Sequence, residues 1–337
     1  MSFFFRGRGK PSPQELSRLI AESLLALDGK ATVEVKLLEK ALEEVEKNTL
    51  LMRQMLSGDG ELEANPEHAS QLIIEICKED ILSLFIHKLP MLSWEARKDL
   101  VHCWAILLRD NGCLDYIENH PALLDFLIIC YNNKDIALHC GNMLRECIKY
   151  PSITRCILEL PSLGLFFKYV ELPNFDIASD ALATFKDLFT KHEAEVSQFL
   201  TNHYLLFFEH YEKLLSSTNY VTRRQSLKLL LDILLEPSNA QVLKRFILET
   251  EFLKIIMTLL KDLSKNIQLS AFDIFKVFVA NPNKSPEIIS ILTRNHEALL
   301  LVLRNLPASK AEDDEFEEER DLIIQKIEAL GSPDGTT

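Results

Sequence analysis

The chain has 337 residues, of which 47% are hydrophobic, and it carries a formal net charge of -13. This content is enough for a large core, whereas the acidic balance disfavours a general nucleic-acid-binding protein, whose affinity depends on neutralised phosphates. Between residues 61 and 330 the only glycines are Gly112, Gly141 and Gly164. Their scarcity excludes the glycine-rich phosphate loops of most nucleotide-binding folds.

The N-terminal segment MSFFFRGRGK has an apolar run too short for a signal peptide. No apolar stretch approaches the roughly 18 residues of a membrane span. Seven cysteines, all between Cys77 and Cys156, form no C-x-x-C pair, which favours reduced thiols in the cytosol or nucleus. We therefore expect a cytoplasmic protein in which residues 1–12 form a flexible N-terminal arm.

The region from residue 13 to residue 90 is predicted to be helical. Its segments LLEKALEEVEKNTLLMRQML and ASQLIIEICKEDILSLFIHKL have helical apolar periodicity. Both match the repeat pattern of the later chain less well, as expected for a capping repeat.

From residue 94 onward one apolar pattern occurs five times, at steps of 40, 41, 45 and 45 residues. A small or apolar residue is followed by large or apolar residues four and seven positions later, on one helix face. The five sets are Leu100, Trp104 and Leu107; Cys140, Leu144 and Cys147; Ala181, Phe185 and Leu188; Ser226, Leu230 and Ile233; and Ala271, Phe275 and Phe278. This period is typical of HEAT and armadillo repeats. We predict an all-α, armadillo/HEAT-like helical-repeat solenoid, a single elongated curved domain over residues 13–306.

The stretch FKVFVANPNK, residues 275–284, resembles a β-strand locally but is predicted to end a helix. Its alternation is short, whereas Ile267, Ala271 and Ile274 begin a helical face that continues for more than three turns. Pro282 lacks the amide needed to extend a helix and disfavours helical geometry at Asn281. We therefore expect the helix to stop there.

Residues 307–337 are expected to form an acidic C-terminal helix and tail. Nine acidic residues lie between Glu312 and Glu328, around a short apolar ridge. A solvated final helix or a partly disordered tail explains this composition better than a specific acidic binding motif.

No catalytic constellation is recognisable, so the chain is not expected to be an enzyme. His102-Cys103 and His139-Cys140 do not have zinc-ligand spacing, and core packing explains these pairs better than a metal site. The segment SGDGELEANPEH lacks the ligand order of an EF-hand. We expect no cofactor and no calcium site of this kind.

One basic segment interrupts the acidic chain: residues 213–265 contain 9 Lys and Arg against 5 Asp and Glu. Within it Arg224, Lys228 and Asp232 are spaced four apart and form a polar strip on one helix. Two cations on adjacent turns would suit a carboxylate, although a solvated helix face is favoured on composition alone.

Several long segments together resemble the calcium-binding protein 39 family of scaffolds. They are MSFFF, IALHCGNMLRECI, FDIASDALATFKDL, NYVTRRQSLKLL and NIQLSAFDIFKVFVANPNK, in the family's order along the chain. The resemblance implies an armadillo-like solenoid without catalysis of its own. It also implies that the scaffold binds a STRAD-type pseudokinase and helps it to assemble with and activate liver kinase B, and that it directly activates germinal-centre kinases.

The resemblance further implies a pocket for a C-terminal Trp-Glu-Phe tripeptide of the pseudokinase. The matching positions are Arg224, Lys228, Met257 and Arg294, the last of which is often Lys in the family. A second surface, on the concave side, would contact the kinase domain. Pro237 and Ala240 occupy positions where animal members carry Arg and Phe, so this chain lacks a charge and an aromatic anchor there.

Two other functions remain open at this point. An adaptor for non-kinase partners is compatible with the same repeats, whereas a nucleic-acid-binding repeat protein would need a basic concave face. We expect protein partners, no nucleic acid, no membrane, and a monomer in the free state.

Overall fold

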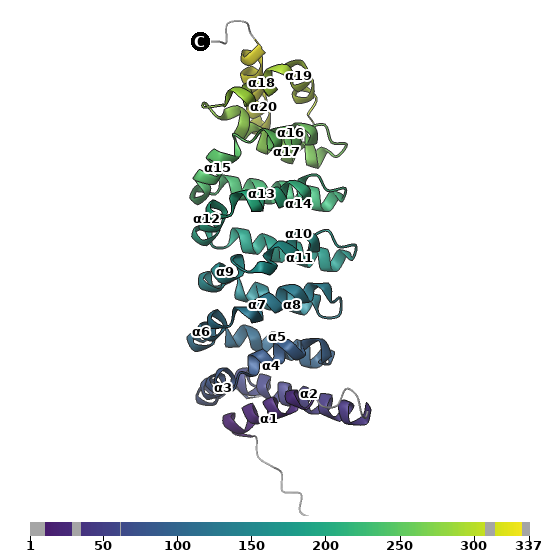
Figure 1. Ribbon diagram of the computed structural model, residues 1–337, viewed down its shortest axis with the longest axis vertical. Helices are drawn as coiled ribbons and strands as arrows, with labels where there is room; N and C mark the ends of the chain where they lie inside the picture. Colours follow the sequence, from purple (N-terminus) through teal and green to yellow (C-terminus); the bar gives the residue numbers. More distant parts are fainter. Residues whose placement is uncertain (1–10, 29–34, 61, 307–313, 332–337) are drawn as a thin grey trace, which may run out of the picture. The chain divides into compact units, whose positions relative to one another are not determined.

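A computed structural model describes residues 11–28, 35–60, 62–306 and 314–331, and every regular element in them is helical (Figure 1). The all-α prediction is therefore confirmed. None of the described helices is both long enough and apolar enough to cross a membrane. The chain divides into two compact units, one that ends at Lys191 and one that begins at His192.

The first unit consists of α-helices joined by short 3-10 turns. They are α1 (Pro13–Leu25), α2 (Val35–Ser57), α3 (Pro66–Lys78), α4 (Ile81–Lys88), η1 (Leu89–Met91), α5 (Trp94–Leu107), α6 (Asn111–Asn119), α7 (Pro121–Ile129), η2 (Cys130–Asn132), α8 (Ala137–Cys147), α9 (Pro151–Leu158), η3 (Pro161–Leu165), α10 (Phe166–Tyr169) and α11 (Phe175–Thr190). The proposed arm, residues 1–12, lies outside the described residues except for its last two positions.

Helices α5, α8 and α11 carry the repeated apolar sets predicted for this unit. All nine side chains of these sets are fully buried, and α8 packs against both α5 and α11. The Trp104 indole Nε1 donates a hydrogen bond of 3.2 Å to the carbonyl oxygen of Met143, which joins α5 to α8. Successive helices of the repeat pattern thus share one apolar core within the unit.

A polar network crosses this core between η2, α8 and α11. The Tyr131 hydroxyl lies 2.8 Å from Oδ2 of Asp180 and 2.9 Å from the Thr184 hydroxyl. Arg145 donates to Asp180 Oδ1 and to Thr184, both at 2.7 Å. Burial and the nearby Asp180 charge raise the pKa of Tyr131 well above its usual range. Gly141 leaves room for the network, because a Cβ there would overlap Asp180 and Tyr131.

The second unit has the same helical construction. It contains α12 (Glu193–Asn202), α13 (Tyr204–Leu215), α14 (Tyr220–Leu235), η4 (Pro237–Asn239), α15 (Ala240–Phe246), α16 (Thr250–Leu259), α17 (Lys265–Ala280), α18 (Pro286–Arg294), α19 (His296–Arg304) and α20 (Asp314–Gly331). The remaining two repeated sets lie on α14 and α17, where all six side chains are buried.

Helix α17 confirms the helical prediction for the phenylalanine-rich stretch. It ends at Ala280, and Asn281 has an extended ψ of 118° immediately before Pro282. The Asn281 side chain accepts a hydrogen bond of 2.9 Å from the amide of Asn283 and so stabilises the turn. Phe275 and Phe278 are fully buried, which explains the apolar character of the run.

Helix α20 is the part of the acidic C-terminal segment that the structure describes. Residues 307–313 and 332–337 of this segment lie outside the described residues. Helix α20 packs against α17, α18 and α19. Its apolar ridge is buried, and the Phe316 ring lies 5.5 Å from that of Phe272. Glu319 pairs with Lys276 at 2.6 Å, at the edge of this contact. The predicted ridge therefore attaches the helix to the preceding repeats, while its acidic faces remain outside.

Candidate peptide-binding site

Helix α14 positions the basic strip predicted from the sequence. The Asn219 side chain caps its first turn by accepting from the amide of Val221 at 2.9 Å. One face, which includes Leu227 and Leu230, is buried in the core. On the opposite face Lys228 is exposed and Arg224 is half-buried, as expected for residues one turn apart.

Arg224 lies where the first turns of α14 and α17 approach each other. The Tyr220 hydroxyl accepts a hydrogen bond of 3.3 Å from the Asn266 side chain. Hydrogen bonds from Asn266 and Ser264, and then the charge and a hydrogen bond of Arg224, lower the pKa of Tyr220. Nε of Arg224 is buried and has no hydrogen-bond partner among the described residues. A cationic donor is therefore available beside a phenol.

The neighbouring Arg223 has a structural role in the same place. It pairs with Asp262 at 3.2 Å, and both side chains are largely buried. It also donates to the carbonyl oxygen of Ser217 at 2.7 Å. Arg223 thereby ties the start of α14 to the turn between α16 and α17.

That turn forms one wall of a groove of about 530 Å³ between α16 and α18. Met257 lies on the groove wall with 9% of its surface exposed. Leu263 is a fully exposed apolar residue at the edge, and Lys261 adds a positive charge. A flexible thioether beside aliphatic side chains suits an aromatic ring.

The four predicted pocket residues are brought together only in part. Met257 lines the groove, and Arg294 is exposed in the last turn of α18, next to the groove residue Asn295. Arg224 and Lys228 lie on α14, outside the groove lining.

Two further cations of the groove were not singled out from the sequence. Lys254 and Lys261 lie three residues before and four residues after Met257. Helical spacing could have placed Lys254 on the Met257 side of α16, whereas Lys261 lies in the turn that follows this helix.

Pro237 and Ala240, the two positions predicted for the kinase-contact surface, are both exposed. Pro237 begins the turn η4 and Ala240 begins α15. The turn is held on its buried side, because the Asn239 side-chain amide (Nδ2) donates to the carbonyl oxygen of Ile233 at 2.8 Å. Neither exposed side chain offers a charge or an aromatic ring to a partner.

The histidine and cysteine pairs do not assemble into a metal site in the described part of the chain, where no group of three or more metal-binding side chains is found. Cys103, Cys140 and His139 are buried in the core of the first unit. The His139 ring packs edge-on against Trp94, with centroids 4.9 Å apart. Burial, and then the charge of Arg97, lower the pKa of His139.

Comparisons with known proteins extend over almost the whole chain. The Mo25-like family model matches residues 3–331. A calcium-binding protein 39-like protein of Homo sapiens is 40% identical over 324 residues, covering 95% of each chain. A Mo25-like protein of Schizosaccharomyces pombe is 37% identical over 335 residues, covering 98% of this chain and 100% of the relative.

Among solved structures, a designed armadillo repeat protein is similar with a TM-score of 0.42 and 14% identity, covering 78% of this chain and 100% of the other. The family match and the two relatives, by contrast, are similar to this chain in sequence over almost its whole length. The chain therefore belongs to the Mo25-like family.

Proposed function

We propose that this protein is a non-catalytic cytoplasmic scaffold that binds a STRAD-like pseudokinase or a germinal-centre-type kinase. Its second unit would hold a C-terminal Trp-Glu-Phe-like peptide of that partner. Family membership supports a helical scaffold with protein partners. The free chain is expected to be a monomer without a cofactor.

The observation that carries the peptide proposal is the buried Nε of Arg224, which has no partner among the described residues. A buried donor without an acceptor costs free energy, and an acceptor on a bound ligand would remove that cost. The peptide's glutamate or terminal carboxylate would accept from Arg224, with Lys228 and Arg294 adding positive charge. Met257 and Leu263 would contact an aromatic ring of the peptide in the adjoining groove.

The kinase domain itself would bind the predicted concave face, near Pro237 and Ala240. Activation requires that this face bind the closed, active kinase conformation more tightly than the open one, because equal affinities shift no equilibrium. Its target would be the helix whose glutamate pairs with the β3 lysine. Equal binding to kinases locked open and closed would rule this mechanism out.

The test of the pocket is calorimetric binding of a short peptide ending in Trp-Glu-Phe. Arg224→Ala is expected to weaken binding by roughly 1.5 to 3 kcal/mol, the range for hydrogen bonds to charged groups. This corresponds to about 10- to 150-fold in Kd. Lys213→Ala is the matched control, because Lys213 is an exposed cation on α13 of the same unit.

The alternative is a helical-repeat adaptor for non-kinase protein partners, which the same fold permits. Absence of peptide binding by the wild-type protein would favour it. Equal affinity of the wild type and Arg224→Ala would instead refute the assignment of the pocket to α14.

A further inference from the structure

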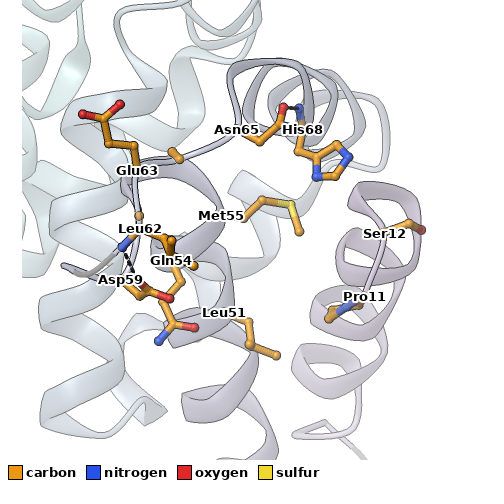
Figure 2. Close-up of a pocket in the computed structure, with 12 residues that line it drawn as sticks. Pro11, Ser12, Leu51, Gln54, Met55, Asp59, Leu62, Glu63, Asn65 and His68 are labelled. Atoms are coloured by element: carbon orange, nitrogen blue, oxygen red, sulfur yellow. Dashed lines mark hydrogen bonds between the residues drawn. The ribbon is translucent and has the colours of Figure 1, made fainter. Parts of the chain in front are cut away.

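A pocket of about 430 Å³ lies in the first unit, far along the chain from the candidate peptide site. It is formed by the start of α1, the end of α2 and the loop that precedes α3. In Figure 2, Leu51 and Met55 of α2 lie between Pro11 on one side and Leu62 on the other. Its volume falls in the range of ordinary ligand pockets.

The loop wall of this pocket has a defined conformation. Gly58 ends α2 with a φ of 83°, and a Cβ there would overlap the carbonyl oxygen of Leu62. The Leu62 amide donates to Oδ1 of Asp59 at 2.9 Å (Figure 2). These contacts hold Leu62 over the pocket although 66% of its surface is exposed. The wall therefore presents an apolar side chain that the described residues leave largely uncovered.

The mouth of the pocket is acidic. The side chains of Asp59 and Glu63 are both exposed on the loop wall. A suitable occupant combines an apolar or aromatic group, for the surface of Leu51, Met55 and Leu62, with nearby positive charge.

The chain's own N-terminal segment has this chemistry and starts at the pocket. Residues 1–10, MSFFFRGRGK, join directly to Pro11, which lines the pocket. Three consecutive phenylalanines precede three cations. Gly7 and Gly9 permit the reversal that a return to the pocket requires. Covalent attachment next to the site also gives a high effective concentration, so that few contacts suffice.

We propose that the pocket between α1, α2 and the loop before α3 binds the phenylalanine run Phe3–Phe5 of the same chain. The segment's cations would then face Asp59 and Glu63. The bound segment would cover the exposed surface of Leu62.

Hydrogen exchange of the full-length protein tests this proposal. In a variant with Phe3→Ala, Phe4→Ala and Phe5→Ala, amides of residues 51–64 are expected to exchange about threefold or more faster than in the wild type. Ser2→Ala is the matched control in the same segment and should leave the exchange unchanged. Equal exchange in the wild type and the triple variant would overturn the proposal.

A peptide experiment identifies the occupant. The synthetic peptide MSFFFRGRGK, added to the triple variant, should restore the slow exchange of residues 51–64. Glu63→Lys changes an exposed side chain. It should weaken the binding of that peptide by about fivefold, as expected for reversing a solvent-exposed charge pair. Equally tight binding to the wild type and the triple variant would mean that the pocket is open to a segment of another protein, and would refute the intramolecular assignment.

Discussion

Replacing Gly141 by alanine should break the polar network between η2, α8 and α11. The new Cβ would overlap the Asp180 carboxylate and the Tyr131 hydroxyl. Alanine in a helix gains about 1 kcal/mol over glycine. Overpacking costs about 1 to 3 kcal/mol, and disturbing the Arg145–Asp180 hydrogen bonds costs about 1.5 to 3 kcal/mol. The two costs less the helix gain give an expected net loss in unfolding free energy of about 1.5 to 5 kcal/mol.

Urea unfolding of the full-length protein measures this loss. Gly164→Ala is the matched control, because no atom lies within 4 Å of the Cβ it would add. We expect its stability to stay within about 0.5 kcal/mol of the wild type, as for surface changes without special contacts. If the stability of Gly141→Ala also stayed within that range, the close approach of Asp180 to Gly141 would not contribute to the free energy of unfolding, and the prediction would be wrong.

Two further predictions concern folding. Phe316→Ala should detach α20 at a cost of about 3 kcal/mol, because a largely buried ring is lost. Proteolysis at residues 314–331 should accelerate, whereas Glu318→Ala, an exposed change on α20, should not accelerate it. The lowered pKa of His139 means that the unfolded chain binds more protons once the pH falls below about 6.5, so stability falls there. The drop in Tm between pH 7.5 and 5.5 should therefore be smaller in His139→Gln, and an equal drop would contradict this.

The repeat helices were predictable because their cores obey local periodicity. Leu100, Trp104 and Leu107 fall on one helix face by spacing alone, and their burial follows from that face. The end of α17 was also predictable from nearby residues, because Pro282 prevents the helix from continuing.

Contacts between distant residues were not predictable in the same way. Tyr131 and Asp180 are 49 positions apart and meet only through the packing of neighbouring repeats. The same holds for Arg223 and Asp262, whose pairing sets one end of the groove beside Met257. Periodicity identifies which face of a helix is apolar, but it does not specify which polar groups of two helices will face each other.

The packing of the acidic C-terminal segment was predictable only in part. Its charges suggested solvation, and its apolar ridge alone did not identify a partner. Phe316 contacts Phe272 because α17 exposes a complementary aromatic surface. Phe272 lies 44 positions before Phe316 in the chain, outside any local window.

The placement of the tryptophans gives the protein a built-in optical reporter. The chain has two, Trp94 and Trp104, both on α5 of the first unit. Trp104 is fully buried whereas 64% of Trp94 is exposed, so the emission shift on denaturation comes mainly from Trp104. Fluorescence thus follows the first unit, while circular dichroism follows the helices of both. Coincident transitions would identify unfolding as one cooperative event, and separate transitions would give each unit its own stability.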